Sequence, residues 1–150
     1  MSATTATALK TIIEGAALGL AAYRDRAPTG TRRPYVTITE DISNVPERHG
    51  DHGDPDADQA TTELVQVDLW SRLKTGNPDD YDGNLNDPYE DPALIRGLHL
   101  LLNGGRADTA PTRIYGITVD DYVRLVEHDR GVVHHAFTVR VRRAVRAISA

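Results

Sequence analysis

The last third of the chain constrains the fold most, because it holds two long runs in which apolar and polar residues alternate. These runs cover Arg113–Glu127 and Val132–Val145, and the short segment between them has the length of a hairpin loop. Alternation with a period of two is typical of a strand that buries one face. The second run predicts an inward row and an outward row: Val133, Phe137, Val139 and Val141 inward, and His134, Thr138, Arg140 and Arg142 outward. We therefore expect a long antiparallel hairpin.

Two earlier segments show the same alternation and are rich in β-branched residues. They cover Pro34–Ile42 and Thr61–Arg72, and we expect them to pair antiparallel. The polar stretch between them, about residues 43–60, has no periodicity, and neither has the acidic connection of about residues 74–90. Both are predicted to be long, mobile loops.

Two segments carry the spacing of amphipathic helices. Residues 5–24 place apolar side chains on one face, and the helix is expected to end before Pro28. A second helix is expected to begin at Asp91-Pro92, which supplies an N-cap and a first-turn proline, and to stop at Asn103-Gly104-Gly105.

The order of these elements predicts one α+β domain over residues 1–150. Its antiparallel or mixed sheet should have about four main strands, with two helices packed on one face and long acidic loops. A chain of 150 residues with 39% hydrophobic and 26% charged residues is long enough and apolar enough to fold as one such unit.

Charge is unevenly distributed along the chain. Residues 40–91 hold 15 acids and 3 bases, a local charge of −12, whereas the remaining residues sum to +7 and the whole chain to −5. A net negative charge argues against a protein that grips nucleic acid through its phosphates. The longest apolar run near the N-terminus is too short for a membrane span, and the region does not have the pattern of a signal peptide. We therefore expect no membrane partner.

Motifs for metal or cofactor chemistry are weak. The chain has no cysteine. An EF-hand beginning at Asp54 would need glycine at position 59 and an acid at position 65, where the chain has Gln59 and Val65. We therefore interpret the histidines and acids of this segment as a solvated loop rather than a metal site: His49, Asp51, His52, Asp54, Asp56 and Asp58.

Other candidate catalytic groups also lack a supporting pattern. Ser71 has no nucleophile elbow around it, and Gly104-Gly105 follows a helix, which is the wrong end for a phosphate cradle. His134 and His135 are neighbours on a strand and should point to opposite faces. A second group of acids is interpreted as a solvated connection: Asp79, Asp80, Asp82, Asp87, Glu90 and Asp91. We predict no catalytic residue, cofactor or metal.

Several side chains that fit no catalytic or metal pattern are candidates for contacts between subunits. Trp70 faces away from the apolar row of its strand. Packing beneath a helix or loop and anchoring a subunit interface are equally open to it. Arg140 and Arg142 are expected to pair with acids, and a head-to-tail ring would let them meet the acidic Asp54, Asp56 and Asp58 of the next copy.

The order of elements resembles the tail terminator, or tail completion, proteins of long-tailed bacteriophages. The similarity runs through residues 34–38 with the following Pro46-Glu47-Arg48, through Val65–Arg72, and through the helix and the two strands that follow. It covers nearly the full chain, although no single motif is specific. The acidic insertion at 49–60 is longer than such a protein needs.

The resemblance implies a structural virion protein without catalytic residues. Such subunits form a ring, usually of six copies, that ends the growing tail tube and joins it to the head connector or stopper protein. Its partners would be itself, the tail tube protein and the connector, with DNA passing through the lumen unbound. The protein would lie at the tail neck of the virion, and in the host cytoplasm during assembly. Another neck or tube ring component, or a small metal-dependent hydrolase or nuclease, remains an alternative.

Overall fold

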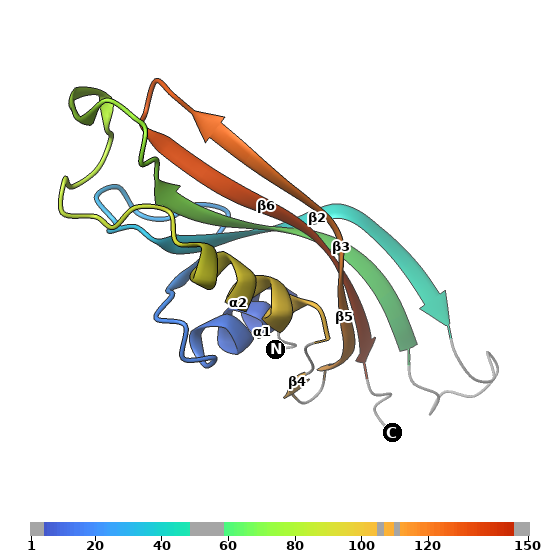
Figure 1. Ribbon diagram of the computed structural model, residues 1–150. Helices are drawn as coiled ribbons and strands as arrows, with labels where there is room; N and C mark the ends of the chain where they lie inside the picture. The colour runs from blue at the N-terminus through green and yellow to red at the C-terminus, as the bar shows by residue number, and fades with distance from the viewer. Residues whose placement is uncertain (1–4, 49–58, 105–106, 110–111, 146–150) are drawn as a thin grey trace.

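The computed structural model describes residues 5–48, 59–104, 107–109 and 112–145 (Figure 1). Along the chain its elements are α1 (Thr5–Glu14), β1 (Ala22–Arg24), β2 (Tyr35–Arg48), β3 (Gln59–Arg72), the short 3-10 helix η1 (Pro78–Asp80), α2 (Pro92–Leu102), β4 (Ala107–Thr109), β5 (Thr112–Glu127) and β6 (Val132–Val145). The described strands form one six-stranded sheet in the order β1-β2-β3-β6-β5-β4. β1 runs parallel to β2 and every other described pair is antiparallel, so the predicted mixed α+β sheet is confirmed.

Both helices lie on the same side of the curved sheet (Figure 1). The core between them and the sheet is built from the alternate residues of the strands, among them Val67 and Leu69 of β3 and Phe137 of β6, with Leu9 of α1 and Leu98 of α2 pressed onto them. All five side chains are fully buried. The opposite side of the sheet, which we call the open face, carries no helix in the described part of the chain. The expected inward row of β6 is confirmed.

The N-terminal helix is shorter than its apolar pattern predicts. α1 ends at Glu14 rather than at residue 24, because the chain turns through left-handed backbone at Ala17 (φ 57°) and Gly19 (φ 71°). Glu14 accepts a hydrogen bond from the Ala22 amide at 3.1 Å, which holds the returning chain against the helix. Ala22–Arg24 then form the edge strand β1, which runs parallel to β2. Leu20, just before β1, and Ala22, within it, therefore reach the core from outside the helix.

The predicted loop at 43–60 is wrong at both of its ends. Residues 43–48 belong to β2 and pair with residues 59–64 of β3, from Ser43 opposite Leu64 to Arg48 opposite Gln59. Figure 1 shows the ends of β2, β3 and β6 extending past both helices. A strand beyond the helices has no core to face, so its backbone can pair without an apolar–polar alternation. Residues 49–58, including Asp54, Asp56 and Asp58, lie outside the described residues.

The acidic connection at 74–90 is irregular, as predicted, but its polar groups are bound to the body of the domain. Its only described helical turn is η1, and Tyr89 forms an isolated bridge with Arg72. The backbone amide of Asp82 donates to the carbonyl of Arg130 at 3.0 Å, and Arg72 donates to the carbonyl of Leu85 at 2.7 Å. The mobility of this segment stays a prediction. Several hydrogen bonds hold the segment to the body of the domain.

The second helix and the C-terminal hairpin follow the sequence. Asp91 caps α2 by accepting from the Ala93 amide at 3.0 Å, and Pro92 occupies its first turn. β5 and β6 span almost the predicted residues and are joined at the predicted turn, where Gly131 has a φ of 63°. None of the described helices is long and apolar enough to cross a membrane.

A bulge in β5 changes which residues face the core. Val119 pairs with Val139, but the next registered pair is Asp121 with Thr138, so one extra residue is inserted in β5. An inserted residue reverses the direction of every side chain that follows. Tyr122 therefore lies opposite Phe137 on the helix side, while the apolar Val123 turns to the open face and is 43% exposed.

We expect the substitution Phe137→Ala to lower the free energy of unfolding by about 3–5 kcal/mol, because it empties a fully buried site between the sheet and α2. Leu100→Ala serves as the matched control, since Leu100 is 67% exposed and its loss should cost no more than about 0.5 kcal/mol. Urea unfolding measures both. Equal losses in the two variants would contradict the assignment of the core.

Candidate functional site

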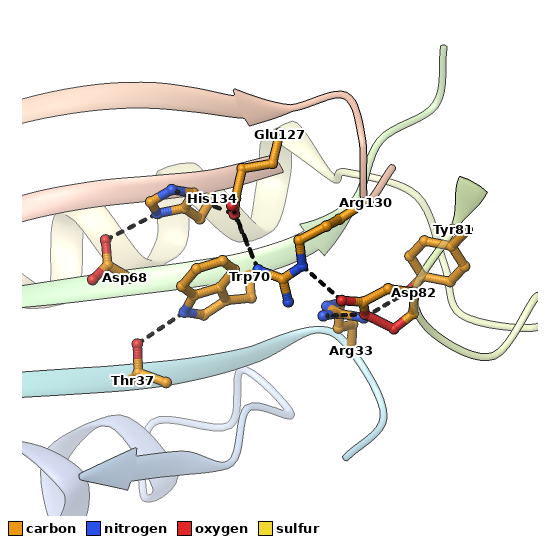
Figure 2. A network of polar contacts seen from close by, with 9 residues as sticks. All are labelled: Arg33, Thr37, Asp68, Trp70, Tyr81, Asp82, Glu127, Arg130 and His134. Carbon is orange, nitrogen blue, oxygen red and sulfur yellow. Dashed lines mark hydrogen bonds and ion pairs between the residues drawn. The ribbon is translucent and has the colours of Figure 1, made fainter. Parts of the chain in front are cut away.

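The open face carries a connected network of aromatic and charged side chains around Trp70 (Figure 2). The indole stacks on His134 of the neighbouring strand, with ring centroids 4.2 Å apart and an angle of 8° between the planes. Its Nε1 donates to Thr37 Oγ1 at 2.8 Å. His134 in turn contacts Asp68 through Nδ1 at 3.3 Å. Trp70 is thus held by side chains of β2 and β6 and remains partly exposed.

The network follows from strand register. Tyr35 pairs with Trp70 and Trp70 pairs with His134, so open-face side chains of β2, β3 and β6 lie in one row across the sheet. Cross-strand neighbours at this separation contact each other directly, and an aromatic pair contributes about 0.5–1.5 kcal/mol. The sequence placed Trp70 and His134 on outward rows, but it could not place them side by side.

A second part of the network joins the loops at the same end of the sheet. Arg130 lies 5.9 Å from the centre of the Trp70 ring and donates through Nε to Asp82 at 2.6 Å. Arg33 donates to the other oxygen of Asp82 at 3.0 Å and to the Asp82 carbonyl at 3.1 Å. Tyr81 donates to the buried Asp87 at 2.6 Å. Two arginines from distant segments therefore fix one carboxylate.

These contacts change the ionisation of the groups involved. Burial raises the pKa of Tyr81 to about 12, and its hydrogen bond to Asp87 acts in the same direction. Burial alone would raise the pKa of Asp82, but the hydrogen bonds from Arg130 and Arg33 outweigh it and lower that pKa. Asp82 is therefore a fixed anion and Tyr81 a neutral donor near pH 7. Neither is poised to exchange a proton in a reaction.

A polar hollow of about 670 Å³ lies beside this network. Its wall includes the loop at 25–33, together with Trp70, Asp82 and Arg130. Its four arginines face three aspartates: Arg26, Arg32, Arg33 and Arg130 against Asp25, Asp82 and Asp87. Because charge among these residues is nearly balanced, the hollow is suited to polar contact with another molecule.

A second cluster lies on the helix side of the sheet. The Tyr122 hydroxyl is 2.5 Å from Nδ1 of His135, and Nε2 of His135 is 2.5 Å from Glu90. Arg124 holds Glu90 with two hydrogen bonds of 2.8 Å. A carboxylate beside Nε2 favours the tautomer with its proton on Nε2, so Nδ1 accepts from the tyrosine.

Ionisation in this cluster favours a neutral histidine. Burial lowers the pKa of His135, although Glu90 opposes that shift. The Arg124 hydrogen bond lowers the pKa of Glu90, and burial raises the pKa of Tyr122. The hydroxyl is thus oriented by His135, and the cluster joins Glu90, just before α2, to side chains of β5 and β6.

Several sequence predictions of site residues can now be judged. Arg140 is paired within the subunit, donating to Asp120 at 2.8 and 3.0 Å, and Arg143 contacts Glu63 at 3.2 Å. Arg142 is exposed, and no ion pair is recorded for it within the described ranges. The expected pairing with an acid is thus seen for Arg140, whose partner lies on β5 of the same subunit. The contact of Arg140 and Arg142 with a neighbouring copy stays a prediction.

The acids of the connection at 74–91 separate into two groups. Asp79 and Asp80 are exposed, in agreement with a solvated loop, and Asp91 is the predicted cap. The solvated interpretation is wrong for Asp82, Asp87 and Glu90, which bind arginines or a tyrosine. In the part of the chain that the structure describes, no group of three or more histidines and acids could hold a metal ion.

Sequence reasoning missed the cluster of Glu90, Tyr122, Arg124 and His135. The sequence carried one signal of it. Arg124 stands between the apolar Val123 and Leu125, which indicates that Tyr122 and Arg124 share one face of the strand. The bulge that turns Tyr122 and Arg124 toward α2 leaves no mark in the sequence. No protein-family model matches the chain, and no curated protein matches it.

We expect Arg33→Ala to lower the free energy of unfolding by about 1–3 kcal/mol, because Arg33 is 5% exposed and its loss removes several charged hydrogen bonds. The adjacent Arg32→Ala is the matched control: its side chain is 68% exposed and should cost no more than about 0.5 kcal/mol. Thermal unfolding compares them. A larger loss for Arg32→Ala would refute the role given to Arg33.

We also expect stability to fall on acidification below about pH 6.5, the ordinary pKa of histidine. His135 has a lowered pKa when folded, so the unfolded chain binds the proton first and is favoured as pH falls. His135→Gln should flatten the pH dependence between about pH 5 and 6.5, whereas His128→Gln, at an exposed position, should preserve it. Chemical unfolding at a series of pH values measures the slope. Parallel curves for all three proteins would contradict this account.

Proposed function

We propose that this chain is a structural subunit that assembles into a ring at the end of a bacteriophage tail tube. In this role it would stop tube growth and present a surface to the head connector or stopper protein. The resemblance in element order suggests the role, and six copies would be the usual number. DNA would pass through the lumen without specific contacts, and the ring would belong to the tail neck of the virion after assembly in the host cytoplasm.

The observation that carries this proposal is the extension of the sheet past both helices (Figure 1). There β2 stays paired with β3 out to Arg48 and Gln59, and β3 stays paired with β6 out to Val145. A part of a sheet that no helix covers has surface to bury on another molecule. In a head-to-tail ring each subunit offers one such surface and receives another at a different patch.

Charge supports the same arrangement. The sequence from 49 to 58 that joins β2 to β3 is acidic, while the exposed Arg142 lies on β6, opposite Thr62 of β3. Contacts between unlike charges set register and speed docking, whereas exposed ion pairs add only about 0–1 kcal/mol each. Arg142 is the better candidate for this contact, since Arg140 would first have to leave Asp120.

The proposed ring can be tested with Arg142→Glu, and the exposed Arg96→Glu on α2 is the matched control of equal charge change. We expect the first variant to weaken ring formation and tube capping by about tenfold, and the control to assemble normally. Light scattering across a salt series measures copy number, and electron microscopy with tail tubes measures capping.

Two outcomes would count against the proposal. The wild-type protein could remain monomeric at every salt concentration even with tubes added, or Arg142→Glu could assemble as well as the wild type. Polymerisation of the purified protein into tubes, rather than capping of them, would favour a different ring component of the virion. Metal-dependent cleavage of labelled DNA would favour the remote hydrolase alternative.

A further inference from the structure

A groove runs between helix α2 and strand β5 on the helix side of the sheet. It encloses about 590 Å³. α2 contributes Ile95, Arg96, His99 and Leu100 to its wall, and β5 contributes Tyr122 and Arg124. The apolar members are unusually open, with Leu100 67% and Tyr122 39% exposed. The groove therefore presents apolar and basic side chains beside the edge of β5.

The strand that borders the groove has an uncovered outer edge. β4 pairs only with residues 112–114 of β5, and the end of α2 reaches two further positions through the Gly104 amide and the Asn103 side chain. From Asp121 to Glu127 no other strand is recorded beside this edge in the described ranges. Unpaired amide and carbonyl groups along an edge are a template for another extended chain.

The side chains next to this edge would suit both faces of an added strand. On the helix side such a strand would meet Leu100 and Tyr122, and on the open face it would lie beside Val123 and Leu125, which are 43% and 42% exposed. Successive side chains of a strand point to opposite faces, so apolar residues of the added chain would find apolar neighbours on either side.

Charge in the groove favours an acidic partner. Glu90 is already bound by Arg124, and His135 lies against it. Arg96 is exposed, and within the described residues no carboxylate is recorded beside it. The wall formed by α2 therefore keeps one positive charge available for a carboxylate.

Self-pairing of two β5 strands fits this edge less well. An antiparallel pair centred near Arg124 would bring Asp121 of one copy opposite Glu127 of the other at both ends. Like charges directly opposite in a sheet are destabilising. A segment from a different protein can avoid this repulsion by placing its acidic residues on the helix side, because Asp121 and Glu127 lie in the open-face row of β5 with Val123 and Leu125.

We propose that the groove between α2 and β5 binds an extended acidic and apolar peptide segment of a partner protein, which adds to the sheet as a strand beside residues 121–127. The bulky apolar side chain of the segment would enter the hollow beside Leu100 and Tyr122. An acidic side chain would pair with Arg96. This interaction does not depend on the proposed ring, because it uses the outer edge of β5 from Asp121 to Glu127, whereas Arg142 lies on β6 beside Gly116.

The probe is a fluorescein-labelled peptide of sequence TEVFVET. Two matched peptides accompany it, one with lysine in place of each glutamate and one with N-methyl groups on alternate residues, which removes backbone donors but keeps the side chains. Fluorescence anisotropy measures binding to the full chain. We expect the acidic peptide to bind, the lysine peptide to bind about tenfold more weakly, and the N-methylated peptide to lose binding.

Protein variants locate the bound peptide. Arg96→Glu and Leu100→Asp should each weaken binding by about tenfold, whereas Arg142→Glu should leave it unchanged. Both groove positions are exposed, so the variants should remain folded, which circular dichroism verifies. Hydrogen exchange should show new protection in residues 121–127 when the acidic peptide is present.

The proposal is overturned by any of three results: no peptide binds at about 1 mM, the N-methylated peptide binds as well as its parent, or the groove variants bind normally. A change of copy number in Arg96→Glu or Leu100→Asp without peptide binding would assign the groove to a second copy of the chain and would also overturn it. Because Arg142→Glu tests the ring separately, either idea can fail alone.

Discussion

The unbroken pairing of β3 with β6 is the interaction on which the other elements depend. It runs from Gln59 opposite Val145 to Arg72 opposite Val132 without a register shift. Both neighbouring pairings are interrupted, β2 with β3 between Thr39 and Ser43, and β5 with β6 twice. The two central strands therefore keep one apolar row facing the helices along most of their length, and the outer strands bend and bulge around them. The strands that carry the two candidate surfaces are these central strands and their direct neighbours, β2 beside β3 and β5 beside β6.

The bulge in β5 creates the difference between the two sides of the sheet at its outer edge. Without the extra residue, Val123 and Leu125 would extend the core row and Arg124 would face solvent. With it, Arg124 reaches Glu90 and the apolar pair becomes exposed. Exposure of apolar side chains beside an unpaired edge opposes solubility unless a partner covers them.

The sequence predicted what depends on local pattern. The C-terminal hairpin, the Asp91 cap and the split of His134 and His135 between two faces each follow from spacing within one element. It failed where tertiary contacts override such patterns. The apolar residues after Glu14 read as helix, yet two left-handed residues return the chain as a strand. The polar residues at 43–48 read as a loop, yet pairing with β3 alone makes them a strand. The partners of Trp70 and Glu90 come from strands far away in the sequence, and no local pattern predicts contacts between such distant residues.

The two sides of the sheet use charge in different ways, which bears on how each meets a partner. On the open face Asp82 is fixed by Arg33 and Arg130, so a molecule docking there meets side chains already held in place and need not order them. In the groove beside α2 the backbone edge is unpaired and Arg96 has no recorded acid among the described residues. A surface with satisfied polar groups suits contact through shape and long-range charge, whereas a surface with unsatisfied backbone groups gains most from a chain that completes its hydrogen bonds. The two proposed contacts therefore differ in kind: a rigid neighbour suits the open face, and an extended segment suits the edge beside α2.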